Sequence, residues 1–208
     1  MKKLVIAAGM AFCLMGPSFA FALDKLVDPD LGMDVVKPRE MTCRQFEKGS
    51  ADLQLFVSAW YDGDSTDGIP SEVEYSKADV LSMQKSLFRD CKDDPNATLE
   101  ELEFSYGVGG DFRDPTCSFL LGIKDQRDAW TFLSWGLGFF AQERRVSTID
   151  MDDFVEMGNS LIQTCKSSPR ANVMEEMQSY LNVGRRGMSS PSGSSSGMDG
   201  WEKNIENI

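Results

Sequence analysis

The chain has 208 residues, of which 33 are acidic and 21 basic, and its formal net charge is -12 at pH 7. This acidity, without any clustered basic face, argues against nucleic acid or an anionic membrane surface as the partner. The chain contains no histidine. Any response to pH must therefore come from carboxyl groups, which as a class titrate near pH 4.

The first 22 residues predict a cleaved secretory signal peptide. Lys2 and Lys3 precede an apolar run over residues 4–15 that is too short to span a bilayer, and Ala20 and Ala22 supply the small-x-small cleavage pattern. No later stretch predicts membrane insertion. Cleavage leaves 19 bases against 33 acids, a net charge of about -14. It also removes Cys13 and leaves four cysteines, so we expect a periplasmic protein in a compartment where disulfides persist.

Residues 23–40 are polar, contain two prolines and a glycine, and predict an extended lead-in. A first helical unit then spans residues 41–106. Thr42 is a good N-cap for a short helix, and Ser50 precedes a second helix that we expect to stop at the acidic loop of residues 62–68. Ser76 begins a third helix that ends near a cysteine. A short last helix is predicted over residues 97–104.

A Gly-rich linker, residues 107–115, leads to a second unit over residues 116–183. A helix is predicted over residues 125–141, where Gly136 and Gly138 weaken its C-terminal half. The clearest amphipathic helix covers residues 151–165, and a last helix should end before Gly184. The Gly/Ser-rich tail, residues 184–208, is predicted to be disordered. We therefore predict an all-α fold with two small helical units in tandem.

The two units share one cysteine spacing. Cys43 and Cys91 are 48 positions apart, Cys117 and Cys165 are also 48 apart, and the second pair lies 74 positions after the first. Such a repeat indicates a duplicated structural unit. Four cysteines allow three pairings, and the repeat favours one disulfide within each unit. Closing a loop of this length is worth about 4 kcal/mol in the chain-entropy model, so we interpret the cysteines as structural.

The residues around these cysteines resemble the HdeA/HdeB acid-stress chaperone family over residues 41–104 and 116–181. The first unit carries Lys37-Pro38 upstream of Met41-Thr42-Cys43-x-x-Phe46, with the second cysteine 48 positions later. The second unit carries Pro115-Thr116-Cys117-x-x-Leu120, followed by Ala129-Trp130 and Thr164-Cys165-Lys166. Members of the family are small periplasmic all-α proteins with one internal disulfide.

Family members are dimers at neutral pH. In strong acid they dissociate, loosen, and expose apolar surface that holds denatured proteins in solution without ATP. The resemblance therefore implies unfolded or acid-denatured periplasmic proteins as partners, and no cofactor. Because this chain carries two units, we expect the second to replace the dimer partner and give a monomer with an internal pseudo-dimer, or a higher homo-oligomer. The alternative is a constitutive periplasmic binding or immunity-like protein with no acid switch.

Large apolar side chains gather in the second helix of each unit and define the candidate client or inter-unit surface. They are Phe56, Trp60, Tyr61, Trp130, Leu133, Trp135, Phe139 and Phe140. In one interpretation these residues form the two cores and the seam between them. In the other, part of the set becomes the client surface in acid. Both can hold at different pH.

Two other functions receive little support from the sequence. The acidic loop of residues 62–68 is one residue out of register with the EF-hand calcium pattern, and position 73 is Val where the bidentate glutamate belongs. We therefore predict a solvated loop and no metal site. Catalysis lacks a histidine base, and disulfide pairing accounts for the four mature cysteines. We predict that the protein is not an enzyme.

Overall fold

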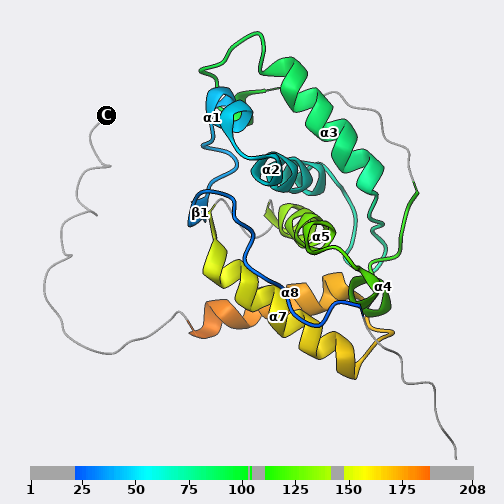
Figure 1. Ribbon diagram of the computed structural model, residues 1–208. Helices are drawn as coiled ribbons and strands as arrows, with labels where there is room; N and C mark the ends of the chain where they lie inside the picture. Colours follow the sequence, from blue (N-terminus) through cyan, green and yellow to red (C-terminus); the bar gives the residue numbers. More distant parts are fainter. Residues whose placement is uncertain (1–21, 103, 105–110, 142–147, 188–208) are drawn as a thin grey trace, which may run out of the picture.

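The computed structural model describes residues 22–102, 104, 111–141 and 148–187, and this part of the chain is mostly helical (Figure 1). Residues 1–21 of the predicted signal peptide, residues 107–110 of the predicted linker and residues 188–208 of the predicted tail lie outside the described residues. The first unit contains α1 (Cys43–Lys48), α2 (Ala51–Asp64), α3 (Lys77–Asp90) and the 3-10 turn η1 (Leu99–Glu101). The second contains α4 (Cys117–Gly122), α5 (Gln126–Phe139), α7 (Met151–Ser167) and α8 (Val173–Gly187). The all-α prediction is confirmed.

Predicted N-caps begin three of these helices. The hydroxyls of Thr42, Ser50 and Ser76 each accept a hydrogen bond from a backbone N–H in the first turn of α1, α2 and α3. Such a bond satisfies one of the N–H groups that a helix start leaves without an intrahelical partner. Local polar chemistry therefore sets where the first unit's helices begin.

The duplication is visible in the backbone hydrogen bonds. Cys43 N donates to Ala97 O at 2.9 Å, and 74 positions later Cys117 N donates to Ala171 O at 2.8 Å. One residue before each cysteine an antiparallel bridge closes the same frame, Thr42 with Thr98 and Thr116 with Asn172. The second helices follow a different offset, because α2 begins at residue 51 and α5 begins at residue 126, which is 75 positions later.

The core is organised around α2 and α5. In Figure 1 these two helices lie side by side at the centre, with α3 on one side and α7 and α8 on the other. α3 packs on α2, whereas α7 packs on α4 and α8. From α8, the side chains of Met174 and Met177 lie against Gly136 of α5. Both units therefore contribute to one continuous apolar core.

Three predicted boundaries are wrong. In the described part of residues 97–104 only the short turn η1 forms, because the reciprocal capping box of Thr98 and Glu101 is followed by extended backbone at Leu102. Helix α2 includes Asp62 and Gly63 and ends at Asp64. Both residues are buried, with Gly63 lying against α5, so they are not part of a solvated loop. Helix α8 passes Gly184 and ends at Gly187. The predicted disordered tail therefore begins too early.

The segment before the first unit also differs from the predicted polar lead-in. Leu23, Leu26, Leu31 and Val36 are buried in the core. Strand β1 (Val35–Val36) pairs antiparallel with β2 (Ile149–Asp150), which directly precedes α7. The N-terminal segment therefore belongs to the second unit in space, although it precedes the first in sequence. Its acidic and proline residues mask the widely spaced leucines that carry the packing.

Candidate functional site

The two units meet along α2 and α5, which approach each other through reciprocal glycines. A Cβ atom built on Gly63 would lie 1.9 Å from the carbonyl oxygen of Trp135, and one built on Gly138 would lie 1.9 Å from the carbonyl oxygen of Trp60. No side chain fits at either position, so the two helix backbones are in direct contact. Each unit presents a glycine to the other unit's tryptophan carbonyl.

Most of the predicted client or inter-unit surface lies buried at this junction, which we term the α2–α5 seam. Phe56, Trp60, Tyr61, Leu133, Trp135 and Phe140 are buried. Phe139, the last residue of α5, is half-buried and contacts Trp135 and Phe140. Trp130 is half-buried, and its indole N–H donates to the carbonyl of Val27 in the N-terminal segment at 2.8 Å. The set is thus brought together apart from Trp130, which binds the N-terminal segment.

Four further aromatic residues complete the seam and were not predicted as part of it. The Tyr75 ring centre lies 5.2 Å from Phe132 and 5.4 Å from Trp135, both in edge-to-face geometry. Phe119 contacts Phe132, and Phe154 of α7 contacts Phe56 of α2. Such pairs add about 0.5–1.5 kcal/mol each beyond the burial of their area. Aligning the units at an offset of 75 pairs Trp60 with Trp135 and Gly63 with Gly138, and this signal was available in the sequence.

One end of the seam is closed by a cation. The guanidinium of Arg39 lies 5.5 Å from the ring centre of Trp60 and pairs with Asp64 at 3.1 Å and with Glu100 at 3.7 Å. Burial raises the pKa of Asp64, and Arg39 opposes that rise. Next to it, the Tyr61 hydroxyl donates to the carbonyl of Pro38, and burial raises the pKa of that phenol. Arg39 thus places a charge directly over an otherwise apolar seam.

Polar contacts also cross between the units. The hydroxyl of Ser134 on α5 donates to the carbonyl of Phe56 on α2 at 2.8 Å, and the bond is buried. At the surface Arg127 of α5 lies 2.7 Å from Asp52 of α2. The Arg127 Nε–H is not aligned as a hydrogen bond, so this contact is an ion pair. A second ion pair joins Lys77 of α3 to Asp128 of α5. Both inter-unit ion pairs depend on an aspartate.

Two buried polar groups at the seam lack a hydrogen-bond partner among the described residues. They are the indole N–H of Trp60 and the hydroxyl of Tyr75. Burying such a group without a partner costs about 1–3 kcal/mol. Burial also raises the pKa of Tyr75. The seam is therefore packed for apolar contact, with some polar groups left unsatisfied.

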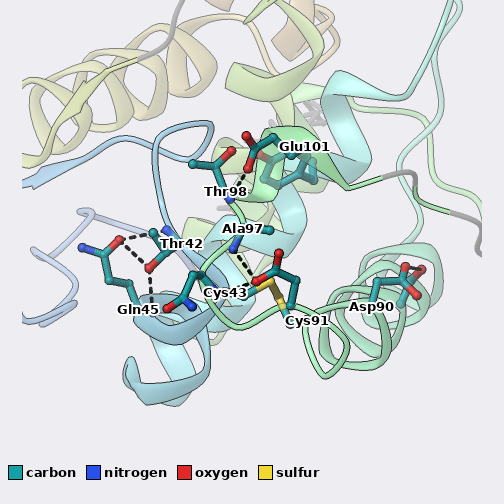
Figure 2. Close-up of a disulfide and its surroundings, with 12 residues drawn as sticks. Thr42, Cys43, Gln45, Asp90, Cys91, Ala97, Thr98 and Glu101 are labelled. Atoms are coloured by element: carbon teal, nitrogen blue, oxygen red, sulfur yellow. Dashed lines mark hydrogen bonds between the residues drawn. A yellow bond between two sulfur atoms is a disulfide. The ribbon is translucent and has the colours of Figure 1, made fainter.

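Both predicted disulfides are present, Cys43–Cys91 and Cys117–Cys165, each across 48 positions. Figure 2 shows the first one close to two capping interactions. Gln45 accepts from the Thr42 N–H at 2.8 Å, and Glu101 accepts from the Thr98 N–H at 2.8 Å. Each disulfide ties the start of a unit to the C-terminal end of its amphipathic helix. All four sulfurs belong to fully buried cysteines, as expected for structural bridges.

A cleft of about 550 Å³ opens between the units, away from the glycine contacts. Tyr75 and Lys77 of the first unit and Phe119, Ile123 and Asp128 of the second are among its lining residues. In the part of the chain that the structure describes, no group of three or more acidic or cysteine side chains could hold a metal ion. The predicted acidic loop of residues 62–68 begins as the end of α2, over residues 62–64, and continues as a turn and irregular backbone.

Comparisons of this chain with protein-family models, curated proteins and solved structures return no match. The geometry of the seam and the sequence motifs are therefore the grounds for any functional proposal. Over the described ranges, no helix combines the length and apolar character that crossing a membrane requires.

Proposed function

We propose that the protein is an exported, HdeA-like holdase that is activated by acid and binds denatured proteins through the faces of its α2–α5 seam. The proposal combines the family resemblance of the two cysteine-framed units with one structural observation. Two units, each closed by its own disulfide, bury a large aromatic face against each other. At the surface, ion pairs that involve aspartates join the two units. Separating the units would present that face to solvent without breaking either disulfide.

Strong acid supplies a physical reason for the units to separate. Carboxylates as a class lose their charge in strong acid, so ion pairs that depend on them are lost. Two such pairs join the units, Arg127 with Asp52 and Lys77 with Asp128. The 19 bases that remain after signal removal keep their charge, so the chain becomes strongly cationic and repels itself. Exposed ion pairs contribute little singly. The expected driving force is therefore the summed change in charge, with the lost pairs favouring separation along the seam.

Individual carboxyl groups act in both directions. A hydrogen bond from Arg89 lowers the pKa of Asp90, and Lys166 lowers the pKa of Asp24. A carboxyl group whose pKa is lowered by folding contributes stability above its ordinary pKa, and this stability is lost as the pH falls through the lowered value. Asp64 has a raised pKa, so uptake of its proton favours the folded state as pH falls. Proton uptake by Asp64 therefore opposes acid opening at the end of the seam where Arg39 lies.

The covalent link between units distinguishes this chain from a dissociating dimer. Tethering holds the partner unit at an effective concentration in the millimolar range, which favours reclosure. We therefore propose that the seam reopens and recloses within one molecule and does not need a second copy. Export into an oxidising compartment is part of the proposal, because the two disulfides persist only there.

The test is aggregation of a periplasmic extract at pH 7 and at pH 2.5, with and without the purified protein, alongside its own size at both values. The proposal predicts suppression of aggregation at pH 2.5 only, by a species that remains monomeric and expands. A dye that binds exposed apolar surface should respond in the same pH range. Equal suppression at both pH values, or none at pH 2.5 with disulfides intact, would sink the acid-activated holdase.

A second candidate is a constitutive binding protein without an acid switch. The open cleft between the units favours it, since the half-buried Phe119 lines this cleft, with its ring against the buried Tyr75. This candidate predicts capture of one specific periplasmic protein at pH 7 and loss of capture when Phe119 is replaced by Ala. The acid-activated holdase predicts no stable partner at that pH.

A further inference from the structure

The N-terminal segment of residues 22–31, which we term the strap, lies in a groove of the second unit as an extended peptide. It has no regular secondary structure, yet Leu23, Leu26 and Leu31 are buried while Val27 is 55% exposed. Its first two amides, those of Ala22 and Leu23, both donate to the carbonyl of Leu121. The groove is formed by residues of α4, α5 and α7, and the strap fills it.

The groove contacts the strap mainly through its backbone. The side-chain amide of Asn159 accepts from Leu26 N at 2.9 Å and donates to Leu26 O at 3.2 Å. The amide of Gln126 donates to Lys25 O at 2.7 Å and accepts from Val27 N at 3.1 Å. Two carboxamides and the Trp130 indole thus bind five of the six backbone N–H and C=O groups of residues 25–27. Recognition of this kind does not depend on the side chains of the bound segment.

The selectivity for side chains comes from the buried apolar site that holds Leu26, which we term the seat. Leu26 is fully buried, and its side chain packs against Gly158 of α7, where a Cβ atom would lie 2.4 Å from Leu26 Cδ2 and 3.1 Å from Leu133 Cδ1. Glycine at this position therefore makes room for the leucine. Leu23 and Leu31 add buried contacts three positions before and five positions after the seat. The charged contact, from Lys166 to the exposed side chain of Asp24, lies at the edge.

We propose that this groove is a peptide-binding site for extended apolar segments of client proteins, and that the strap occupies it as an internal competitor. Its ligand is an extended chain with a leucine-like residue in the central seat and apolar residues three before it and five after it. The carboxamides and the indole that hold the backbone carry no charge, so they keep their hydrogen bonds in acid. This inference rests on the proposed function for the nature of its occupant and adds a second, sequence-tolerant binding surface to the seam.

The first unit lacks the residues that form this groove in the second. Applying the offsets of the two units, Gln84 and Lys85 stand where the second unit has Gly158 and Asn159, and Ala51 stands where it has Gln126. The first unit therefore offers neither the seat nor the paired carboxamides. The groove is a property of the second unit alone.

The test uses the full mature chain at pH 7 and a fluorescent peptide with the sequence of residues 22–31. Leu26→Ala weakens the internal competitor, which the tether otherwise holds at millimolar effective concentration, and should bind the peptide at least about tenfold more tightly than the unmodified chain. Val27→Ala, the adjacent exposed position, should bind like the unmodified chain. Adding Gly158→Val to Leu26→Ala fills the seat and should abolish binding. A folded Leu26→Ala chain that binds no better than this double variant overturns the proposal.

Hydrogen exchange on the unmodified chain provides the measurement that does not depend on any variant folding. A displaceable strap predicts that the amides of Leu26 and Val27 exchange at least about a hundredfold faster than those at the centre of α5, through local opening. Equal protection means that the strap leaves only on global unfolding, which also overturns the proposal. Both readouts are taken at pH 7, where the holdase is expected to be closed. Failure here therefore leaves the acid response standing, and failure of acid aggregation suppression leaves peptide binding to be judged by itself.

Discussion

The two units share a backbone frame but fill it in different ways. In the first unit α3 packs directly along α2, and its last element is the short turn η1. In the second unit the strap lies against α5 and α7, and the last element is the 15-residue helix α8. The matched hydrogen bonds at Cys43 and Cys117 show that the cysteine frame is common to both. The two units thus share the cysteine frame and a central helix, while their outer layers differ.

Removal of each disulfide tests the common frame with the largest expected effect. Each bridge closes a span of 48 positions, so the chain-entropy model assigns the same contribution to both, about 4 kcal/mol. We expect Cys43→Ser with Cys91→Ser, and Cys117→Ser with Cys165→Ser, to lower the free energy of unfolding by similar amounts. Urea denaturation at pH 7 measures both. A difference of more than about 2 kcal/mol would mean that the outer layers, and not the shared loop length, decide the stability of each unit.

The reciprocal glycines test the symmetry of the seam. Gly63→Ala and Gly138→Ala each place a methyl group 1.9 Å from a backbone carbonyl, so the helices must move apart. We expect each to lower the free energy of unfolding by about 3 kcal/mol, at the upper end for overpacking. Gly122→Ala is the matched control, because no atom lies within 4 Å of its Cβ position. Equal losses of stability at Gly63 and Gly138 would support a symmetric seam, and a loss at only one of them would contradict it.

The buried inter-unit hydrogen bond tests a smaller difference between the halves. Ser134→Ala removes the cross-unit donor to the carbonyl of Phe56, and Ala59 already occupies the matching position on α2. We expect a loss of about 1 kcal/mol in the free energy of unfolding. Ser118→Ala is the control, since its hydroxyl donates to the carbonyl of Pro169 at an exposed site, where water replaces the bond. The same loss in the free energy of unfolding in both variants would show that burial at the seam does not increase the contribution of the hydrogen bond to stability.

The smallest expected effect is the contribution of two carboxyl groups to the pH dependence of stability. The contribution of Asp90 decreases as the pH falls, whereas that of Asp64 increases. The lowered pKa of Asp90 predicts that Asp90→Asn loses stability at neutral pH relative to the unmodified chain, and that this difference disappears in acid. Because the pair is exposed, solvent screening limits the difference to a few tenths of a kcal/mol. The raised pKa of Asp64 predicts that the unmodified chain gains stability relative to Asp64→Asn as the pH falls. Unfolding free energies at pH 7, 5 and 3.5 measure both, and slopes of the same sign would contradict the assignment.

Local features were predictable from the sequence where chemistry and spacing act over a few residues. The N-caps at Thr42, Ser50 and Ser76 and the two disulfides follow from capping chemistry and from the repeat. The fate of residues 97–104 was not predictable, because tertiary contacts decide whether so short a segment completes a helix. The helical start of the acidic loop was missed for the same reason, since Asp62 is buried despite its polarity and Gly63 lies against α5 of the other unit.

The seam was predicted only in part. Hydrophobic spacing identified Trp60 and Trp135 as candidate residues of the seam. The cysteine offset of 74 did not align them with each other, because they are 75 positions apart. Gly138 was interpreted as a residue that weakens its helix. The structure makes that glycine the point of closest approach. The strap was missed because its leucines are separated by two and four residues of mostly polar sequence, a pattern with neither helical nor strand periodicity. Such segments acquire their role from the groove that receives them.

Accessibility of the two seam tryptophans tests the acid opening most directly. Replacing Trp130 and Trp201 by Phe leaves Trp60 and Trp135 as the remaining tryptophans of the chain. Acrylamide quenching of their fluorescence is then measured at pH 7 and at pH 2.5, with thiol titration confirming that both disulfides are intact. We predict strong protection at pH 7, as their complete burial requires, and quenching that approaches that of a free indole at pH 2.5. Protection that persists at pH 2.5 would contradict an acid-opened seam.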